Sequence, residues 1–283
     1  MSDNKNIDLI GKEYKCLDKG FIRLVDYMGD DSSIVQAARV SYGKGTKTIT
    51  EDKGLIRHLM RHRHTSPFEM VELKFHVKLP IFVARQWIRH RTANVNEYSG
   101  RYSEMKDEFY IPDIEQIRQQ STLNKQGRGS EVLPYDIALS IIEQFEKTQS
   151  QLFNEYSGLL EQDLARELAR INLPLSNYTE WYWKIDLHNL FHFLKLRLDI
   201  HAQYEIRIYA EIIGNILKEI VPVAYQAFED YLLNSINLSR IEADIIWEHN
   251  KITLPDDQSM INAGLTKGEI REFKEKINLY LTK

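Results

Sequence analysis

Residues 71–91 read VELKFHVKLPIFVARQWIRHR, and they describe one strand followed directly by one helix. Five apolar residues alternate with four polar ones over 71–79, which is the pattern of a β-strand with one buried and one wet face. Pro80 comes next, and proline is tolerated at the first position of a helix. We therefore expect a helix from Pro80 toward Arg91, and the chain to leave it near that arginine.

The remainder of the chain is predicted to be rich in helix. Two further strands are predicted at 20–28 and 177–185, where aromatic and β-branched residues gather. The polar segment 92–103 predicts a loop, and 113–134 predicts a surface insertion. Helices are expected at 30–40, 50–62, 135–160 and 163–172, and from about Leu187 to the C-terminus, where the last 45 or so residues form a charged appendage.

The composition excludes several classes of protein. The chain has 283 residues, of which 43% are apolar, which is enough for one large domain, alone or with an appendage. A net charge of −4 argues against a nucleic-acid partner, so any cationic site is local and suits a small anionic ligand. The only cysteine is Cys16, which excludes a disulfide within the chain. With no apolar run long enough for a membrane span and no signal peptide, we expect a cytoplasmic protein without a membrane partner.

The end of the predicted helix at 80–91 is a candidate anion site. Gln86, Arg89 and His90 lie at positions i, i+3 and i+4, so they share a helix face. The loop that follows adds Arg101 and polar residues, and arginine side chains with loop amides are suited to phosphate recognition. The alternative is a solvated basic helix end, which the helix dipole also favours.

A second candidate lies in the helix predicted from Leu187 onward. Its polar stripe contains His188, His192, Lys195 and Asp199, whereas Arg197 falls within the apolar arc. An arginine on an apolar face is rare unless it is paired, because its desolvation is costly. Either Arg197 forms a salt bridge, for example with Glu205 two turns later, or it is a cation placed at a buried ligand.

Other chemistry is disfavoured by the spacing of the residues. His58 and His62, like His188 and His192, are i, i+4 pairs that could bind zinc. Three arginines surround the first pair, neither pair has the glutamate of an H-E-x-x-H motif, and we predict no metal. Ser99 is not predicted to be a nucleophile, because no G-x-S-x-G elbow surrounds it.

Several motifs together resemble one family, the flavin-dependent thymidylate synthases (ThyX). RHRTANVNEYS, residues 89–99, is similar to the family signature. The other matching motifs, in the family's order, are AARVS (37–41), HTSPFE (64–69), PIFVARQWIRHR (80–91), NEYSGRY (96–102), LARINLP (168–174) and LRLDIHAQYEIRIYA (196–210). The resemblance covers roughly residues 15–230.

The resemblance implies a fold, a reaction and an assembly. The fold is α+β with a mixed sheet and long helices, as one thymidylate synthase-complementing-type domain at 15–235, between an N-terminal segment (1–14) and a helical C-terminal extension (236–283). The reaction makes dTMP from dUMP, with 5,10-methylenetetrahydrofolate as the carbon donor, FAD as the hydride carrier and NADPH as the reductant. The assembly is a homotetramer whose active sites are shared between subunits.

The resemblance also assigns residues. Arg197 matches the catalytic arginine that favours the N3-deprotonated uracil, since a cation stabilises negative charge on the ring. Cys16 lies outside every motif, so the mechanism needs no cysteine nucleophile. The residues matched to the dUMP site are Gln86, Trp87, Ile88, Arg89, Glu97, Tyr98, Ser99, Gly100, Arg101, Arg170 and Arg197. Those matched to the flavin site are Ser66, Arg89, His90, Arg91, Glu97, Asp186, Leu187, His188 and His192.

Overall fold

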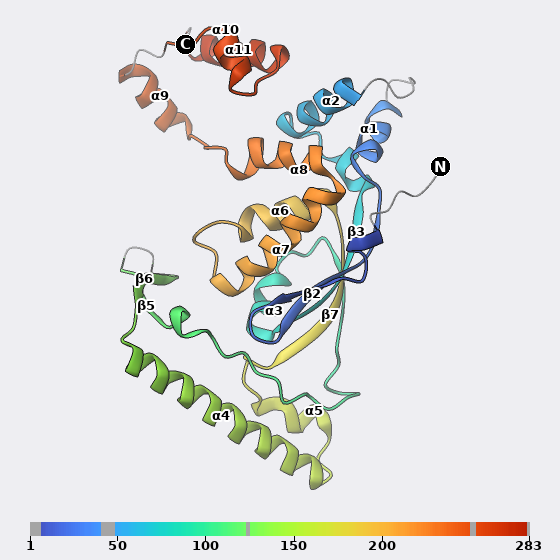
Figure 1. The fold of residues 1–283 in the computed structure, drawn as a ribbon, viewed down its shortest axis with the longest axis vertical. Helices are drawn as coiled ribbons and strands as arrows, with labels where there is room; N and C mark the ends of the chain where they lie inside the picture. The colour runs from blue at the N-terminus through green and yellow to red at the C-terminus, as the bar shows by residue number, and fades with distance from the viewer. Residues whose placement is uncertain (1–6, 41–48, 123–124, 250–252, 282–283) are drawn as a thin grey trace.

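The computed structural model describes residues 7–40, 49–122, 125–249 and 253–281, and a five-stranded sheet lies at its centre (Figure 1). Strand β3 is the middle strand, and each neighbouring pair of strands is antiparallel. In sheet order the strands are β1 (Glu13–Cys16), β2 (Gly20–Met28), β3 (Glu72–Pro80), β7 (Tyr178–Asp186) and β4 (Asn94–Glu97).

The alternation that was read from residues 71–79 is confirmed in β3. Leu73, Phe75 and Val77 are at most 1% exposed and face the core. On the other face His76 lies opposite Tyr182 of β7, and their rings stack at 4.8 Å. One face of the sheet is therefore apolar and the other carries polar and aromatic side chains, as the two-residue period of a strand requires.

Helices cover the apolar face of the sheet. Helix α3 begins directly after β3, and its Trp87 is 1% exposed. Trp87 packs against Trp183 of β7 and Phe193 at ring-centre distances of 5.1 and 4.8 Å, which fixes the end of α3 on the sheet. The helices on or beside this face are α3 (Ile81–Trp87), α6 (Leu187–Arg197), α7 (Tyr204–Ile220) and α8 (Pro222–Phe228), followed by η5 (Glu229–Leu233). The helices near the N-terminal end of β3 are α1 (Asp31–Val40), α2 (Ile49–Arg61) and η2 (Ser66–Met70).

The segment between β4 and β7 forms an arm beside this core. It contains the long helix α4, which lies at the opposite end of the molecule from α2 (Figure 1). A small second core of Met105, Tyr156 and Ala169 ties α4 to the chain that leads away from β4. The elements of the arm are η3 (Ile114–Gln116), β5 (Arg118–Gln120), β6 (Arg128–Val132), α4 (Tyr135–Glu161), α5 (Arg166–Ala169) and η4 (Arg170–Asn172).

The α+β class is confirmed, and some of the details are corrected. The sheet was expected to be mixed, but its strand pairs are antiparallel, and a parallel pairing occurs as an isolated bridge between Ile10 and Leu24. The segment 92–103 was expected to be loop, but its middle forms β4, because the backbone of this segment pairs with the edge of β7. The insertion 113–134 contains the hairpin β5–β6, and the helix expected at 163–172 is one turn of α5 followed by η4.

The helix predicted from Leu187 onward is not continuous. Helix α6 ends at Arg197 and α7 begins at Tyr204. Between them Asp199 accepts hydrogen bonds from the backbone N–H and the ring of His201, at 2.8 and 2.9 Å. Such local side-chain bonds offer the backbone an alternative to helix, which explains the break without proline or glycine.

The chain ends in helices α9 (Arg240–His249), α10 (Asp257–Asn262) and α11 (Lys267–Leu281), as expected for the extension. Ser41 of the AARVS motif and residues 1–6 of the predicted N-terminal segment lie outside the described residues. Over the described ranges, no helix combines the length and the apolar composition needed to cross a membrane.

Candidate active site

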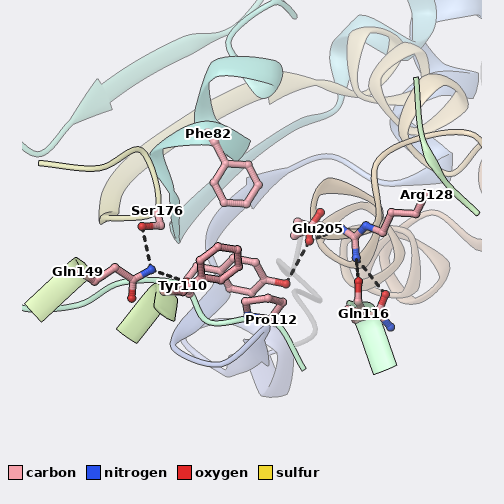
Figure 2. Close-up of a pocket in the computed structure, with 9 residues that line it drawn as sticks. Phe82, Tyr110, Pro112, Gln116, Arg128, Gln149, Ser176 and Glu205 are labelled. Atoms are coloured by element: carbon pink, nitrogen blue, oxygen red, sulfur yellow. Dashed lines mark hydrogen bonds and ion pairs between the residues drawn. The ribbon is translucent and has the colours of Figure 1, made fainter. Parts of the chain in front are cut away.

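The ends of α3 and α6 meet, and this brings three predicted site residues together. Arg197, at the end of α6, donates from Nε to Nε2 of His90 at 3.1 Å. Its Nη2 donates to the backbone carbonyl of Gln86 at 3.3 Å. Glu205 is not its partner, because the break between α6 and α7 directs that carboxylate elsewhere, toward Arg128 (Figure 2). The structure therefore excludes the hypothesis that Arg197 forms a salt bridge with Glu205.

His90 holds Arg197 as a neutral acceptor. Burial, followed by the charges of Arg197 and His192, lowers the pKa of His90 to about 4. The ring is uncharged at neutral pH, so the nitrogen facing Arg197 accepts and the other nitrogen keeps the proton. Burial also lowers the pKa of Arg197, although arginine stays charged in proteins. Neutral groups thus orient a cation without cancelling its charge.

Further positive charge surrounds this pair. Arg89 and Arg91 are exposed just beyond α3, Lys195 is half-buried on α6, and Arg63 is exposed beyond α2. Within the parts of the chain that the structure describes, none of these four residues or Arg197 forms an ion pair with an acid. Uncompensated cations on neighbouring elements suit an anionic ligand such as a phosphate ester.

A cavity of about 260 Å³ lies between α6 and the end of α2, and two of these cations, Arg63 and Lys195, line it. Its walls combine apolar side chains with imidazole and cationic groups. The lining residues are Leu59, Met60, Arg63, His64, Thr65, Phe68, His188, Phe191, His192, Lys195 and Leu232. Apolar walls with a few polar groups are typical of sites for ring-bearing ligands. The predicted flavin residues His188 and His192 are therefore placed at a cavity of the expected character.

A second group of predicted residues lies at the base of the arm, where the loop 97–101 contacts Arg170. A Cβ on Gly100 would lie 2.7 Å from the sulfur of Met105 and 3.0 Å from Cδ of Arg170, so the loop approaches Arg170 closely because residue 100 has no side chain. Arg101 pairs with Glu167 at 3.1 Å, and both side chains are more than half exposed. Exposed pairs contribute little to stability, so a phosphate could replace Glu167 as the partner of Arg101.

The site residues described so far form two groups. The first comprises Gln86, His90 and Arg197, and the second comprises the loop 97–101 and Arg170. Among the described residues, no hydrogen bond or ion pair joins one group to the other. Each group presents donors for an anion, but neither surrounds a ligand by itself.

Some predicted site residues have structural roles. The side chains of Trp87 and Leu187 are at most 1% exposed and belong to the core, so their contacts to a ligand would involve backbone atoms. Asp186 caps α6 by accepting the backbone N–H and the amide of Asn189, at 2.9 and 2.7 Å. Glu97 accepts a hydrogen bond from Thr179 at 2.8 Å. Ile88 is 39% exposed, and Ser66 begins η2 next to the cavity-lining Thr65.

Sequence reasoning missed other residues. Gln203, in the break between α6 and α7, accepts a hydrogen bond from the side chain of Gln86. Arg63 and His64 line the cavity. The tripeptide His62-Arg63-His64 before Ser66 was a signal for the latter two, whereas Gln203 was marked only by its place in the motif at 196–210.

His58 and His62 approach Glu272 of α11, and the three could offer ligand atoms to a metal. However, Arg61 donates to both carboxylate oxygens of Glu272, at 2.7 and 2.9 Å. The hydrogen bonds from Arg61 lower the pKa of Glu272 to about 2. The cluster is therefore an ion-pair network between α2 and α11.

The fold and the two cationic groups define an α+β protein suited to phosphorylated, ring-bearing ligands. The sequence model of the family described as thymidylate synthase complementing protein matches residues 23–223. The chain therefore belongs to this family.

Similar proteins agree with this assignment. The flavin-dependent thymidylate synthase of Treponema denticola is 57% identical over 266 residues, which cover 94% of this chain and 97% of the relative. That of Wolbachia pipientis wMel is 61% identical over 243 residues, covering 86% and 85%. Among solved structures, the UMP/dUMP methylase PolB from Streptomyces cacaoi bound with 5-Br dUMP is 33% identical with a TM-score of 0.71, and the match covers 78% of this chain and 99% of PolB.

Proposed function

We propose that this chain is a flavin-dependent thymidylate synthase that converts dUMP to dTMP. The one-carbon donor is 5,10-methylenetetrahydrofolate and the reductant is NADPH. The observation that supports this most directly is Arg197, a half-buried cation held by a neutral imidazole and a backbone carbonyl, with no acid bound to it among the described residues. The names of the relatives and the dUMP analogue bound to PolB point to the same reaction.

The donor set beside the cavity fits FAD. Phe68 and Phe191 offer apolar walls to a flat ring, and Arg63 and Lys195 line the same cavity. Arg89 and Arg91, exposed just beyond α3, would add cations for the pyrophosphate. When bound, FAD supplies the hydride for the reaction. His188 and His192 would contact the same cofactor from α6.

The role of the chain toward dUMP is to bind, orient and polarise it. Arg101 and Arg170 provide two guanidinium groups for the phosphate, and Gly100 lets backbone amides approach it. Arg197, beside the uracil, lowers the cost of negative charge on the ring, which makes its C5 carbon a better nucleophile. Because the surroundings of Arg197 are partly desolvated, its effect is larger than in water.

The chain acts without a cysteine nucleophile in this proposal. Cys16 is 3% exposed, and burial raises the pKa of its thiol. A buried thiol with a raised pKa is unreactive, because the thiolate is the nucleophilic form.

We further propose a homotetramer with shared active sites. Among the described residues, no hydrogen bond or ion pair joins the two groups of dUMP residues within one chain, and a second subunit would complete the site around the ligand. Leu168, Ile171 and Leu175, which flank Arg170, are 52%, 71% and 61% exposed. Exposed apolar side chains grouped around a half-site are typical of a subunit interface. The enzyme would be cytoplasmic, with residues 15–235 as the catalytic domain and 236–283 as an extension.

The test is reconstitution of the purified protein with FAD. We expect a yellow holoprotein with flavin absorbance, NADPH oxidation that depends on dUMP and the folate, and dTMP detected by mass spectrometry. A protein that does not retain FAD, or that forms no dTMP with every substrate present, would contradict the proposal. The oligomeric state follows from light scattering on the same sample.

A further inference from the structure

Two walls of the cavity proposed for FAD are connected to helix α11 of the C-terminal extension. Leu59 and Met60 of α2 form part of one wall, and Leu232 of η5 forms part of another. Arg61 directly follows Met60, and Tyr231 directly precedes Leu232. Both of these neighbours belong to the ion-pair network that reaches α11, so the extension is bound to the elements that shape the cavity.

Two acids of α11 bind the end of α2. Glu272 accepts two hydrogen bonds from Arg61, at 2.7 and 2.9 Å, and Nε2 of His62 lies 3.1 Å from the same carboxylate. Glu269 accepts a hydrogen bond from Nε of Arg57 at 3.0 Å. A bidentate pair between arginine and a carboxylate fixes direction as well as distance. Helix α11 therefore holds the end of α2 in one orientation.

The same two arginines hold η5. Arg57 donates from Nη1 to Asp230 at 2.6 Å and from Nη2 to the hydroxyl of Tyr231 at 2.8 Å. Nη1 of Arg61 lies 3.4 Å from that hydroxyl. If α11 lost its acids, each arginine would lose a charged partner at an almost buried position, which is unfavourable. Turning toward water would relieve this cost, but it would release Tyr231 and, with it, the adjacent Leu232.

Imidazole rings connect α11 to a third part of the cavity. His64 lines the cavity, and its ring centre lies 5.9 Å from that of His58 and 6.2 Å from that of His62. The rings of His58 and His64 meet edge to face, which is a favoured arrangement of ring pairs. Because His62 also contacts Glu272, the path from α11 to this wall passes through a single side chain.

We propose that α11 completes the cofactor cavity from outside, with Glu269 and Glu272 as positioning residues that hold α2 and η5 in the arrangement that binds the flavin. The proposal rests on the proposed function, because it takes this cavity to bind FAD. Neither acid lines the cavity, so both act through the arginines of α2. The extension lies beyond residues 23–223, which the family model matches, and the proposal gives it a role in the site.

The first test measures the dissociation constant of FAD from the full-length protein by the quenching of flavin fluorescence. The double variant Glu269→Gln with Glu272→Gln removes both charges, because one remaining pair could keep α11 docked. We expect the dissociation constant to rise by about tenfold or more, the effect of about one lost hydrogen bond to a charged group. Glu275→Gln, exposed on the same helix, is the matched control and should bind FAD as the wild-type protein does. Circular dichroism and the thermal midpoint check folding.

The second test uses the wild-type protein and so does not depend on the folding of a variant. Coupling between two sites is reciprocal: if docked α11 favours FAD, bound FAD must favour docked α11. We expect FAD to slow hydrogen exchange of the amides of Lys267–Leu281 by about the same tenfold factor. The reference is β1, an edge strand without a predicted site residue, whose exchange should change less.

An unchanged dissociation constant in the folded double variant, or exchange in α11 that FAD does not slow, would overturn the proposal. A network that only stabilises the extension would give faster exchange in α11 of the double variant but would leave both FAD measurements unchanged. A wild-type protein that binds no FAD would instead contradict the proposed function.

Discussion

An ion-pair network that fastens the C-terminal extension to α2 gives a quantitative prediction. Arg57 of α2 is 7% exposed, and its Nε donates to Glu269 of α11 at 3.0 Å. Arg57 also binds Asp230 at 2.6 Å, and Arg61 lies 3.4 Å from Glu269. The ring of Tyr231 lies under both guanidinium groups, at 4.9 and 5.6 Å. The network therefore joins α2, η5 and α11 around two arginines that are almost buried.

Neutralising Glu269 should release α11 from this network. Removing one partner of a buried pair leaves the other charge desolvated, which costs about 3–5 kcal/mol. Arg57 keeps Asp230 and Arg61 keeps Glu272, so we expect the lower end, about 3 kcal/mol. Glu269→Gln is the cleanest change, because the backbone N–H of Thr266 donates to this side chain at 2.7 Å and glutamine can also accept that bond.

Hydrogen exchange of the amides of Lys267–Leu281 measures this effect in the native protein. A loss of about 3 kcal/mol corresponds to exchange about 100-fold faster in α11. Glu275→Gln is the matched control, because Glu275 is exposed on the same helix and has no ion pair among the described residues. The double variant Arg57→Met with Glu269→Gln should recover most of the loss, since it removes the buried charge that Glu269→Gln leaves without this partner and keeps the bond from Thr266. Exchange that changes less than threefold in Glu269→Gln, or no recovery in the double variant, would refute the reasoning.

Three further predictions concern the active site. Arg197→Ala should lower dTMP turnover by about 100-fold or more, the size expected when a charge partner of the transition state is lost, and normal turnover would contradict the role of this cation. Cys16→Ala should retain most of the turnover in the same assay, and an inactive but folded variant would reopen a thiolate mechanism. The pKa of His90 is about 4 in the folded protein and 6.5 ordinarily, so the unfolded chain takes up the proton first and stability falls as the pH drops from 6.5 toward 4. In His90→Asn the urea midpoint of unfolding should depend less on pH across that window than in the wild-type protein. An equal pH dependence in the two proteins would disprove the assignment.

Much of the fold could be predicted because its signals are local. The strict alternation at 71–79 and the proline after it predicted β3 and α3, and both are found, but α3 ends at Trp87 and not near Arg91 as expected. β4 could not be predicted in this way. Its four residues are exposed and three of them are polar, and they are extended because their backbone completes the edge of β7. Local propensity contains no information about such a pairing between distant segments.

The candidate site was predictable to a similar extent. Helix phase grouped Gln86 with His90, and the structure brings both to Arg197, although α3 ends at Trp87 and His90 lies in the turn that follows it. Phase alone could not place Gln203, which is distant in sequence and contacts Gln86 through tertiary packing. The arginines near His58 were used as an argument against a metal, and their partners were not predicted; Arg57 and Arg61 are paired with acids from η5 and α11. Charge pairing across elements is decided by the fold and is not visible in residue spacing.

The break between α6 and α7 separates Arg197 from Glu205. Even in a continuous helix the two residues would lie about 12 Å apart along the axis, beyond the i, i+4 reach of a direct ion pair. The hydrogen bonds between Asp199 and His201 lie within this break. Glu205 instead compensates Arg128, and Arg197 keeps its charge for a ligand. Gln203 lies within the break and forms hydrogen bonds with both Glu205 and Gln86. The same turn therefore links Glu205, through Gln203 and Gln86, to the site of Arg197.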